Sequence, residues 1–205
     1  MTFDIEAEKN RLHNEAMKAL KAERDEMMRA KTEKRSLLMV HTGNGKGKST
    51  AAFGMVARAL GWEMHVGIVQ FIKGKWRTGE RNFFRRFPDL VRYEVMGEGF
   101  TWETQDRARD IAAASAAWVL SKGMIADPTL DFVLLDELNI ALRYEYIDIN
   151  DVVATLKARP LDKHICITGR DARPELIEIA DLVTDMTMIK HPFQQGMKVQ
   201  RGVDF

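Results

Sequence analysis

A glycine-rich segment, HTGNGKGKST at residues 41–50, carries the residue types that bind phosphate groups. Gly47-Lys48-Ser49 matches the end of the phosphate-binding loop pattern, in which a glycine and four further residues precede Gly-Lys-Ser/Thr. Here position 42 is a threonine, and the glycine comes one residue later, at Gly43. The loop is one residue shorter than usual, which leaves open either ordinary ATP hydrolysis or different chemistry on ATP.

Every part of this loop can take part in nucleotide binding. Backbone N–H groups of a glycine turn, together with the positive end of the following helix, bind phosphate oxygens. Lys48 would neutralise phosphate charge, and the Ser49 hydroxyl would ligate Mg²⁺. The alternative is a strand-to-helix turn that binds no ligand. The predicted nucleotide-binding residues of the loop are Thr42, Gly43, Asn44, Gly45, Lys46, Gly47, Lys48, Ser49 and Thr50.

Two carboxylates, Asp136 and Glu137, directly follow the apolar run FVLL. In open α/β sheets ligands bind at the carboxyl ends of the strands, so this pair should lie beside the phosphate loop. We expect one of them to hold Mg²⁺ or Mn²⁺, directly or through water, because such hard ions prefer oxygen ligands. The alternative is a pair of loop carboxylates in solvent. The predicted metal ligands are Ser49, Asp136 and Glu137.

Two further strand ends carry cations, Lys73 in QFIKG and Arg170 in TGRD. Arg170 could bind phosphates as a planar, bidentate donor. Either cation could equally be a solvated surface charge, and the residues alone leave both interpretations open.

An aromatic pair, Phe100 and Trp102, lies between glycines in GEGFTWET at residues 97–104. Large aromatic side chains on such a loop can cover a flat apolar ligand. Aromatic residues more often serve packing, so the residues alone favour a structural role for this pair.

The elements that position these residues alternate along the chain. Strands are expected at residues 36–43, 65–71, 91–96, 131–137, 164–169 and 186–190. Helices are expected at residues 49–60, 104–126, 149–158 and 173–180. Short continuous apolar strands separated by helices indicate an α/β fold, a mostly parallel sheet with helices on both faces. The glycine loop between the first strand and the first helix makes it P-loop NTPase-like, of the RecA-like type.

The chain divides by composition into two parts. Residues 1–35 are rich in Glu, Lys, Arg, Ala and Met and predict a charged helix, either a solvated flanking helix or a lid over a bound ligand. Residues 36–205 form the nucleotide-binding domain. A formal net charge of +1 gives no field that would attract nucleic acid or a membrane. With no long apolar run, and with Cys166 in a buried strand, we expect a soluble cytoplasmic protein.

The segments TGNGKGKSTAAFG, GIVQFIKG, GERN, GFTWET, LLDELN and ITGR together resemble the P-loop ATP:corrinoid adenosyltransferases of the cobalamin pathway. The resemblance extends from about Val40 to the C-terminal QRGVDF. In this family the short loop is normal. The resemblance implies that ATP lies reversed relative to P-loop hydrolases and presents its ribose C5′ to a cobalt(I) nucleophile. Adenosylcobalamin forms, and the whole triphosphate leaves.

The resemblance also implies roles for individual residues. Residues 43–50 would bind the triphosphate, with Asn44 toward the ribose, and Glu137 would lie near the metal or the ribose. Phe100 and Trp102 would occupy the lower face of the corrin and displace the axial ligand of cobalt(II), which eases reduction to cobalt(I). This reverses the preference for a packing role. The predicted catalytic residues are Lys48, Phe100, Trp102 and Glu137.

The expected partners follow from the same resemblance. They are ATP, cobalamin or a precursor corrinoid, a reduced flavoprotein as electron donor, and a second copy of the chain in a homodimer. Two rival functions remain at this stage: a P-loop ATP hydrolase or phosphotransferase, and a nucleotide-gated binding module without turnover.

Overall fold

The computed structural model describes residues 2–71, 78–96 and 106–204, with side chains from residue 5 onward. By its internal contacts the chain divides into two compact units, Met1–Arg35 and Ser36–Phe205. No helix in the described part of the chain has the length and apolar character needed to cross a membrane.

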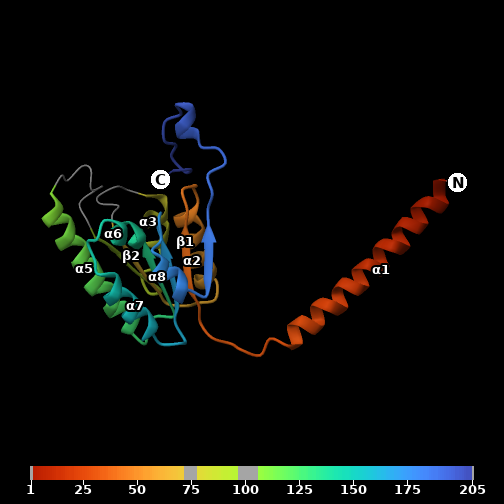
Figure 1. Cartoon of the computed structure of the whole chain (residues 1–205), viewed down its shortest axis with the longest axis horizontal. Coiled ribbons are helices and arrows are strands. Elements are labelled where there is room, and N and C mark those ends of the chain that lie inside the picture. The colour runs from red at the N-terminus through yellow and green to blue at the C-terminus, as the bar shows by residue number, and fades with distance from the viewer. Residues whose placement is uncertain (1, 72–77, 97–105, 205) are drawn as a thin grey trace. The chain divides into compact units, whose positions relative to one another are not determined.

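The first unit contains one long helix, α1 (Thr2–Arg29), drawn in red in Figure 1. Arg11 forms ion pairs with Glu8 at 2.6 Å and with Glu15 at 2.8 Å, each about one turn away. Exposed ion pairs of this kind contribute little to stability. The helix therefore forms from local propensity and charge pairing, and its role as a lid or as a flanking helix stays a prediction.

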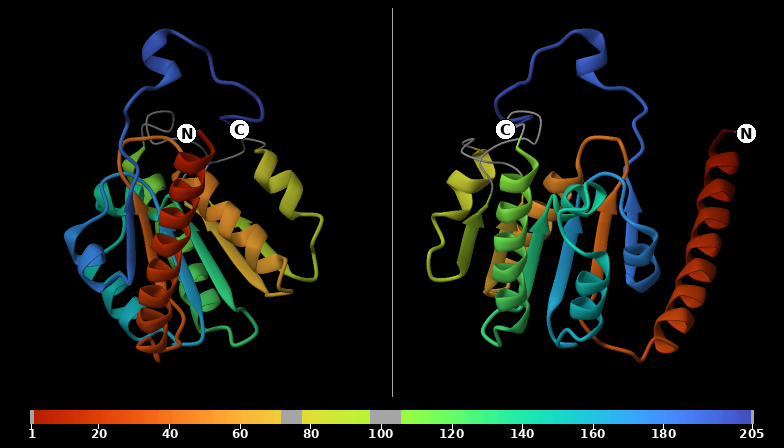
Figure 2. Two further views of the ribbon diagram at one scale, coloured as in Figure 1. Left: turned by 90° about the vertical axis from the view of Figure 1, so that its right-hand side faces the viewer. Right: turned by 60° about the vertical axis from the view of Figure 1, so that its left-hand side comes forward.

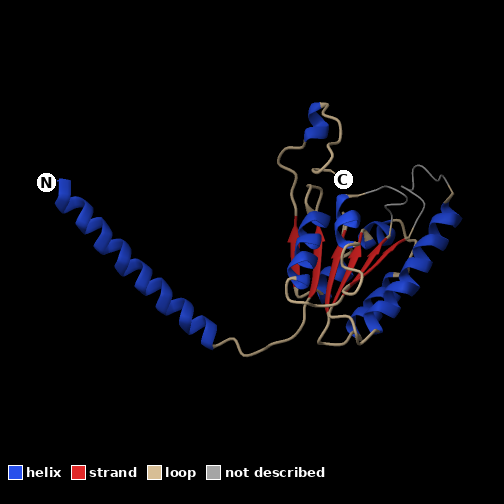
Figure 3. Cartoon of the chain, turned by 180° about the vertical axis from the view of Figure 1, so that it is seen from behind, coloured by secondary structure: helices blue, strands red, loops and turns tan. Residues whose placement is uncertain are grey.

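The second unit is built on a six-stranded sheet in the order β3-β2-β4-β5-β1-β6. Every neighbouring pair of strands is parallel, as the red arrows of Figure 3 show. This arrangement confirms the predicted α/β fold. The strands are β1 (Leu38–Thr42), β2 (Val66–Gln70), β3 (Val91–Val95), β4 (Phe132–Asp136), β5 (His164–Thr168) and β6 (Leu182–Asp185).

Alternate residues of a strand point to opposite faces of the sheet. Both faces of this sheet carry apolar side chains, and helices cover both. In β4, Leu134 packs in one core with Phe53, whereas Leu135 packs in a second core with Trp118. The first core includes residues of α2 (Lys48–Leu60) and α3 (Gly79–Phe84). The second core includes residues of α5 (Arg107–Ala126), α6 (Leu138–Arg143), α7 (Ile149–Lys157) and α8 (Pro174–Ile179).

All the predicted strands but the last are confirmed, with their ends shifted by a few residues. The strand expected at 186–190 is wrong, because β6 is Leu182–Asp185. Its limit is set by its partner: Thr42 pairs with Asp185, and after Thr42 the first strand turns into the glycine loop. Beyond that point a strand would have nothing to pair with in β1. The helices α3 and α6 were not predicted.

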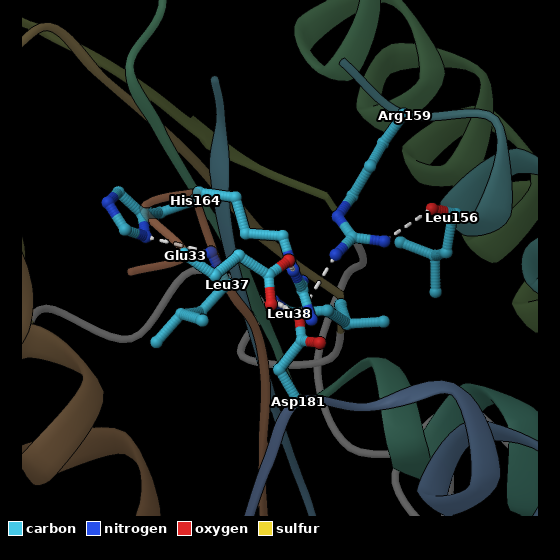
Figure 4. A network of polar contacts seen from close by, with 8 residues as sticks. Glu33, Leu37, Leu38, Leu156, Arg159, His164 and Asp181 are labelled. Atoms are coloured by element: carbon cyan, nitrogen blue, oxygen red, sulfur yellow. Dashed lines mark hydrogen bonds and ion pairs between the residues drawn. The ribbon is translucent and has the colours of Figure 1, made fainter. Parts of the chain in front are cut away.

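Side chains fix the amino ends of the central strands. The N–H of Leu37 donates to Nδ1 of His164 at 3.1 Å, and the N–H of Leu38 donates to Asp181 at 2.8 Å (Figure 4). Arg159 donates to the same Asp181 carboxylate at 3.0 Å. Burial lowers the pKa of His164, which favours the neutral ring that can accept the Leu37 N–H. This network holds the start of β1 between β5 and β6.

A buried lysine caps the last turn of α5. The Lys163 ammonium donates to the carbonyl oxygens of Met124 at 3.2 Å and Ile125 at 2.9 Å, and also to that of Asp127. The last carbonyls of a helix have no partner within the helix, so a cation there satisfies them. Burial lowers the pKa of Lys163.

Candidate functional site

The candidate site lies at the edge of the sheet where all six strands end, the upper edge in Figure 1. The glycine loop follows β1, Glu137 follows β4, and Gly169 follows β5. Because the strands are parallel, their carboxyl ends gather these segments from distant parts of the sequence into one place, the usual location of ligands in open α/β sheets.

The glycine loop requires glycine for two separate reasons. Gly43 and Gly47 have φ angles of 94° and 116°, in the left-handed region that L residues rarely adopt. A β-carbon on Gly43 would also lie 2.7 Å from both the backbone N and O of Met186. Gly47 is the N-cap of α2 and has no side chain that could occupy the first N–H groups of the helix. The start of α2 therefore has no side-chain cap, as a phosphate site at a helix N-terminus requires.

Lys48 folds back over this loop. Its ammonium donates to the carbonyl oxygens of Gly43 at 2.8 Å and Gly45 at 2.6 Å, and the residue is 7% exposed. Burial lowers the pKa of Lys48, while the negative charge of Glu137 raises it and the positive charge of Arg170 lowers it. Glu137 and Arg170 therefore act on Lys48, although they come from different strand ends.

The segment after β6 contacts the loop from above. The N–H of Gly45 donates to the carbonyl oxygen of Met186 at 2.5 Å. Lys46 forms an ion pair with Asp204 at 2.7 Å. Both views of Figure 2 show this C-terminal segment, in blue, arching over the carboxyl edge of the sheet. Two loop residues thus have partners from the end of the chain.

A cavity of about 490 Å³ opens beside the start of the loop. Its size is within the range of small-molecule sites. It is lined by Thr42, Gly43, Asn44, Asp171, Ala172, Ile177, Asp185, Thr187 and Met188.

The two carboxylates after FVLL differ in their surroundings. Asp136 is fully buried, and its carboxylate accepts from Nε2 of Gln70 and from the hydroxyl of Thr168, each at 2.7 Å. Glu137 is half-buried, has a left-handed φ of 65°, and donates its N–H to the Thr168 hydroxyl at 3.0 Å. The interpretation of a pair of loop carboxylates in solvent is therefore wrong for Asp136.

Comparison with known proteins assigns the chain to a family. Residues 34–205 match the family model described as ATP:corrinoid adenosyltransferase BtuR/CobO/CobP. The chain belongs to this family. The resemblance read from the sequence is confirmed, and so is its class as an enzyme, a corrinoid adenosyltransferase with ATP and a corrinoid as its substrates.

Close relatives match this adenosyltransferase over most of its length. The corrinoid adenosyltransferase of Pseudomonas aeruginosa is 56% identical over 97% of this chain and 98% of its own. That of a Sinorhizobium species is 52% identical over 94% and 91%, and Corrinoid adenosyltransferase CobA of Salmonella typhimurium is 48% identical over 84% and 87%. Among solved structures, domain III of the Thermotoga maritima replication initiation protein DnaA aligns with a TM-score of 0.36 and 12% identity over 73% of this chain and 53% of that chain, too distant a likeness to support an argument.

The remaining predicted residues of the adenosyltransferase have varied surroundings. Asn44, Lys46, Thr50 and Arg170 are exposed, and Ser49 is half-buried. The hydroxyl of Thr42 accepts from the N–H of Ala172 at 3.0 Å, which joins the loop to the segment after β5. Lys73, Phe100 and Trp102 lie outside the described residues.

Three residues of this edge were missed from the sequence: Gln70, Tyr93 and Thr168. Tyr93 donates its hydroxyl to Oε1 of Gln70 at 2.9 Å, and burial raises the pKa of the Tyr93 phenol. A signal was present, because VGIVQ, FVLLD and HICIT each end an apolar run with a polar residue. Read together, these endings mark a row of polar side chains at one edge of the sheet.

The donor set suits a hard divalent cation that also binds phosphates. In the described ranges no three His, Cys, Asp or Glu residues gather to hold a metal by themselves. Mg²⁺ is commonly held by one or two protein oxygens together with substrate phosphates and water. The half-buried Ser49, which follows Lys48 in the chain, and the half-buried Glu137, whose charge raises the pKa of Lys48, offer such oxygens. This chain therefore fits a metal that arrives with the nucleotide.

Proposed function

We propose that this adenosyltransferase moves the 5′-deoxyadenosyl group of ATP to the cobalt(I) of a corrinoid. The electron pair of cobalt(I) forms the cobalt–carbon bond at C5′, and the C5′–O bond breaks. Triphosphate leaves with the electrons of that bond, and cobalt becomes formally cobalt(III). Negative charge therefore grows on the triphosphate, which makes stabilisation of the leaving group the main task of the phosphate loop.

The loop residues have the chemistry for that task. The backbone N–H groups of residues 43–47 and the ammonium of Lys48 bind the triphosphate, with Lys46 and Arg170 as further cations. Donors that are already arranged around developing charge lower a barrier without reorganising. Asn44, which is exposed at the mouth of the loop, reaches toward the ribose. What supports these roles is the folded short loop around a buried Lys48.

Mg²⁺ or Mn²⁺ is the proposed metal, held by Ser49 and Glu137, with Asp136 acting directly or through water. When bound, the ion neutralises part of the triphosphate charge. The negative charge of Glu137 raises the pKa of Lys48, which supports a shared role of this carboxylate and this cation at the metal–triphosphate group.

Phe100 and Trp102 are proposed to cover the lower face of the corrin, with cobalamin or a precursor as the corrinoid. A reduced flavoprotein supplies the electron that converts cobalt(II) to cobalt(I). The enzyme is proposed to work as a homodimer in the cytoplasm, with residues 1–35 either flanking the domain or closing over the site.

The observation that carries this function is the short glycine loop, folded at the carboxyl edge of the sheet in a chain whose residues 34–205 match the family model. The test supplies ATP, Mg²⁺ and a chemically reduced cobalt(I) corrinoid to the purified protein. We expect a light-sensitive adenosylcorrinoid in the visible spectrum and one triphosphate for each cobalt–carbon bond.

Release of ADP or orthophosphate without a cobalt–carbon bond would contradict the proposal and favour a hydrolase or phosphotransferase. Binding of ATP without any turnover, even with excess reductant and corrinoid, would favour a binding module.

A further inference from the structure

A row of four polar side chains, three buried and one half-buried, crosses neighbouring strands near the site edge of the sheet. It runs from Tyr93 on β3 to Gln70 on β2, then to Asp136 on β4 and Thr168 on β5. The three hydrogen bonds measure 2.9, 2.7 and 2.7 Å in that order. We call these residues the polar row, and they link the four strands one after another through side chains.

Strand register places the polar row at the carboxyl edge. Gln70 and Asp136 are paired across β2 and β4, and each is the last residue of its strand. Thr168 is the last residue of β5. The strands β2, β4 and β5 are neighbours, and hydrogen bonds join their three last residues. These residues therefore directly precede the segments that form the site.

The interior of a sheet is an expensive place for such groups. Asp136 and Thr168 are fully buried, and Gln70 is 2% exposed. Buried polar groups cost free energy unless they are hydrogen-bonded, and even a fully bonded set is often no more stable than apolar residues of the same size. Stability of the sheet alone therefore gives little reason for a carboxylate at this position.

The end of the row at Thr168 leads into the site. One hydroxyl donates to Asp136 and also accepts the N–H of Glu137, at 3.0 Å. That bond fixes the one residue of the DELN segment with a left-handed backbone, a conformation uncommon outside glycine. A β-carbon on Gly169 would lie 3.3 Å from Oε2 of Glu137, so the carboxylate rests against the glycine that follows Thr168.

We propose that Thr168, Gln70 and Tyr93 are positioning residues of the adenosyltransfer reaction. They hold the Asp136 carboxylate in one orientation and fix the main chain of Glu137, so that the Glu137 carboxylate stays beside Lys48 and the metal–triphosphate group. This inference rests on the proposed function, because it assigns the row to the metal that accompanies ATP. Partners that orient metal ligands affect metal affinity or activity by about 10- to 100-fold when removed.

The central test compares Thr168→Val, which loses the hydroxyl at nearly the same volume, with Thr168→Ser, which keeps it. The first readout needs no corrinoid: ATP binding by calorimetry at increasing Mg²⁺, with Mn²⁺ as a second probe ion. We expect Thr168→Val to raise the Mg²⁺ concentration that ATP binding requires by about 10-fold or more. Thr168→Ser should require nearly the same Mg²⁺ concentration as the wild type. The second readout is kcat for adenosyltransfer, expected to fall by a similar factor.

Ser121→Ala is the matched control. The Ser121 hydroxyl is fully buried and donates to the carbonyl of Ala117 at 2.7 Å in the middle of α5, outside the polar row. It should lower thermal stability while leaving metal-dependent ATP binding unchanged. Wild-type metal dependence in a folded Thr168→Val would overturn the proposal, as would an equal loss in Ser121→Ala.

Tyr93→Phe keeps the inference testable if Thr168→Val does not fold. It removes one hydroxyl at the far end of the row, and we expect a smaller, few-fold loss in the same binding assay. No loss would overturn the role of Tyr93. A wild-type protein that forms no adenosylcorrinoid contradicts the proposed function alone, since the calorimetric comparison still measures whether the row controls metal-dependent ATP binding.

Discussion

Buried polar residues have different roles at the amino edge and at the carboxyl edge of the sheet. At the amino edge, His164 and Asp181 accept the N–H groups of Leu37 and Leu38, and Lys163 caps the carbonyls that end α5. These side chains bind main-chain groups that need a partner wherever the chain starts or ends an element. All of these hydrogen bonds are made within the protein, so these side chains serve stability.

At the carboxyl edge, the polar side chains contact a strained residue and a buried charge, neither of which stability requires. The polar row ends at Thr168, which binds the N–H of Glu137, a residue with a strained left-handed backbone. Lys48 is buried against the carbonyls of Gly43 and Gly45 beside a cavity. Strain and buried charge are tolerated where they prepare a site. Both edges contain buried polar side chains with hydrogen-bond partners, so such bonds do not by themselves indicate a functional site. The group that the bonds hold in position is the better indicator.

Gly43→Ala should give the largest effect at the carboxyl edge. The new β-carbon would strain a φ of 94° and meet the Met186 backbone at 2.7 Å, so the loop must move. We expect ATP binding to become undetectable by calorimetry. Gly54→Ala is the control, because Gly54 is exposed in α2 with nothing within 4 Å of its β-carbon position. That change should stabilise the protein by about 0.5–1 kcal/mol, and equal ATP affinity in the two variants would contradict the role of the turn.

Lys48→Ala should have the second-largest effect on ATP binding. Loss of a charged donor to phosphate costs about 1.5–3 kcal/mol of binding free energy, so the Kd for ATP should rise by about tenfold or more. Corrinoid binding, followed by its visible spectrum, should persist. Lys46→Ala should weaken ATP binding less, because Lys46 is exposed and already paired with Asp204. A larger effect at Lys46 than at Lys48 would reverse our assignment of the main phosphate cation.

Lys163→Met tests the other side of the comparison. Buried carbonyls that lose their donor cost about 1–3 kcal/mol, and we expect a loss of that order in the free energy of unfolding by urea. The KM for ATP should not change. A shifted KM without a loss of stability would break the distinction between the two edges.

The smallest expected effect is a pH dependence at the amino edge. Because the pKa of His164 is lowered on folding, the unfolded chain binds the proton more readily, and stability falls as pH drops below about 6.5. His164→Asn keeps an acceptor for the Leu37 N–H but cannot titrate. Urea unfolding of both proteins at several pH values should show a flatter acid decline in the variant, and parallel curves would show that His164 contributes nothing.

Much of the molecule could be predicted where the signal is continuous in sequence. The glycine loop occupies ten adjacent residues, and apolar runs predict buried strands such as HICIT, in which burial raises the pKa of Cys166 to about 12. The short helices α3 and α6, of six residues each, are too brief to show a helical period. The roles of the predicted site residues stay predictions.

The polar row could not be predicted, because its members are joined only by the order of the strands. Gln70 and Asp136 meet across β2 and β4, which are not consecutive in the chain, and that order does not follow from either strand alone. The prediction of the last strand was wrong for the same reason, because the pairing of β6 with β1 decides where β6 ends.

The contact between Gly45 and Met186 has a consequence for how nucleotide enters. A peptide oxygen of the chain already engages the amide that a phosphate oxygen would seek, and the Asp204 carboxylate engages Lys46. Under the proposed function, phosphate oxygens would replace these two acceptors when ATP binds. The apparent ATP affinity would then include the free-energy cost of breaking the contacts of Gly45 with Met186 and of Lys46 with Asp204.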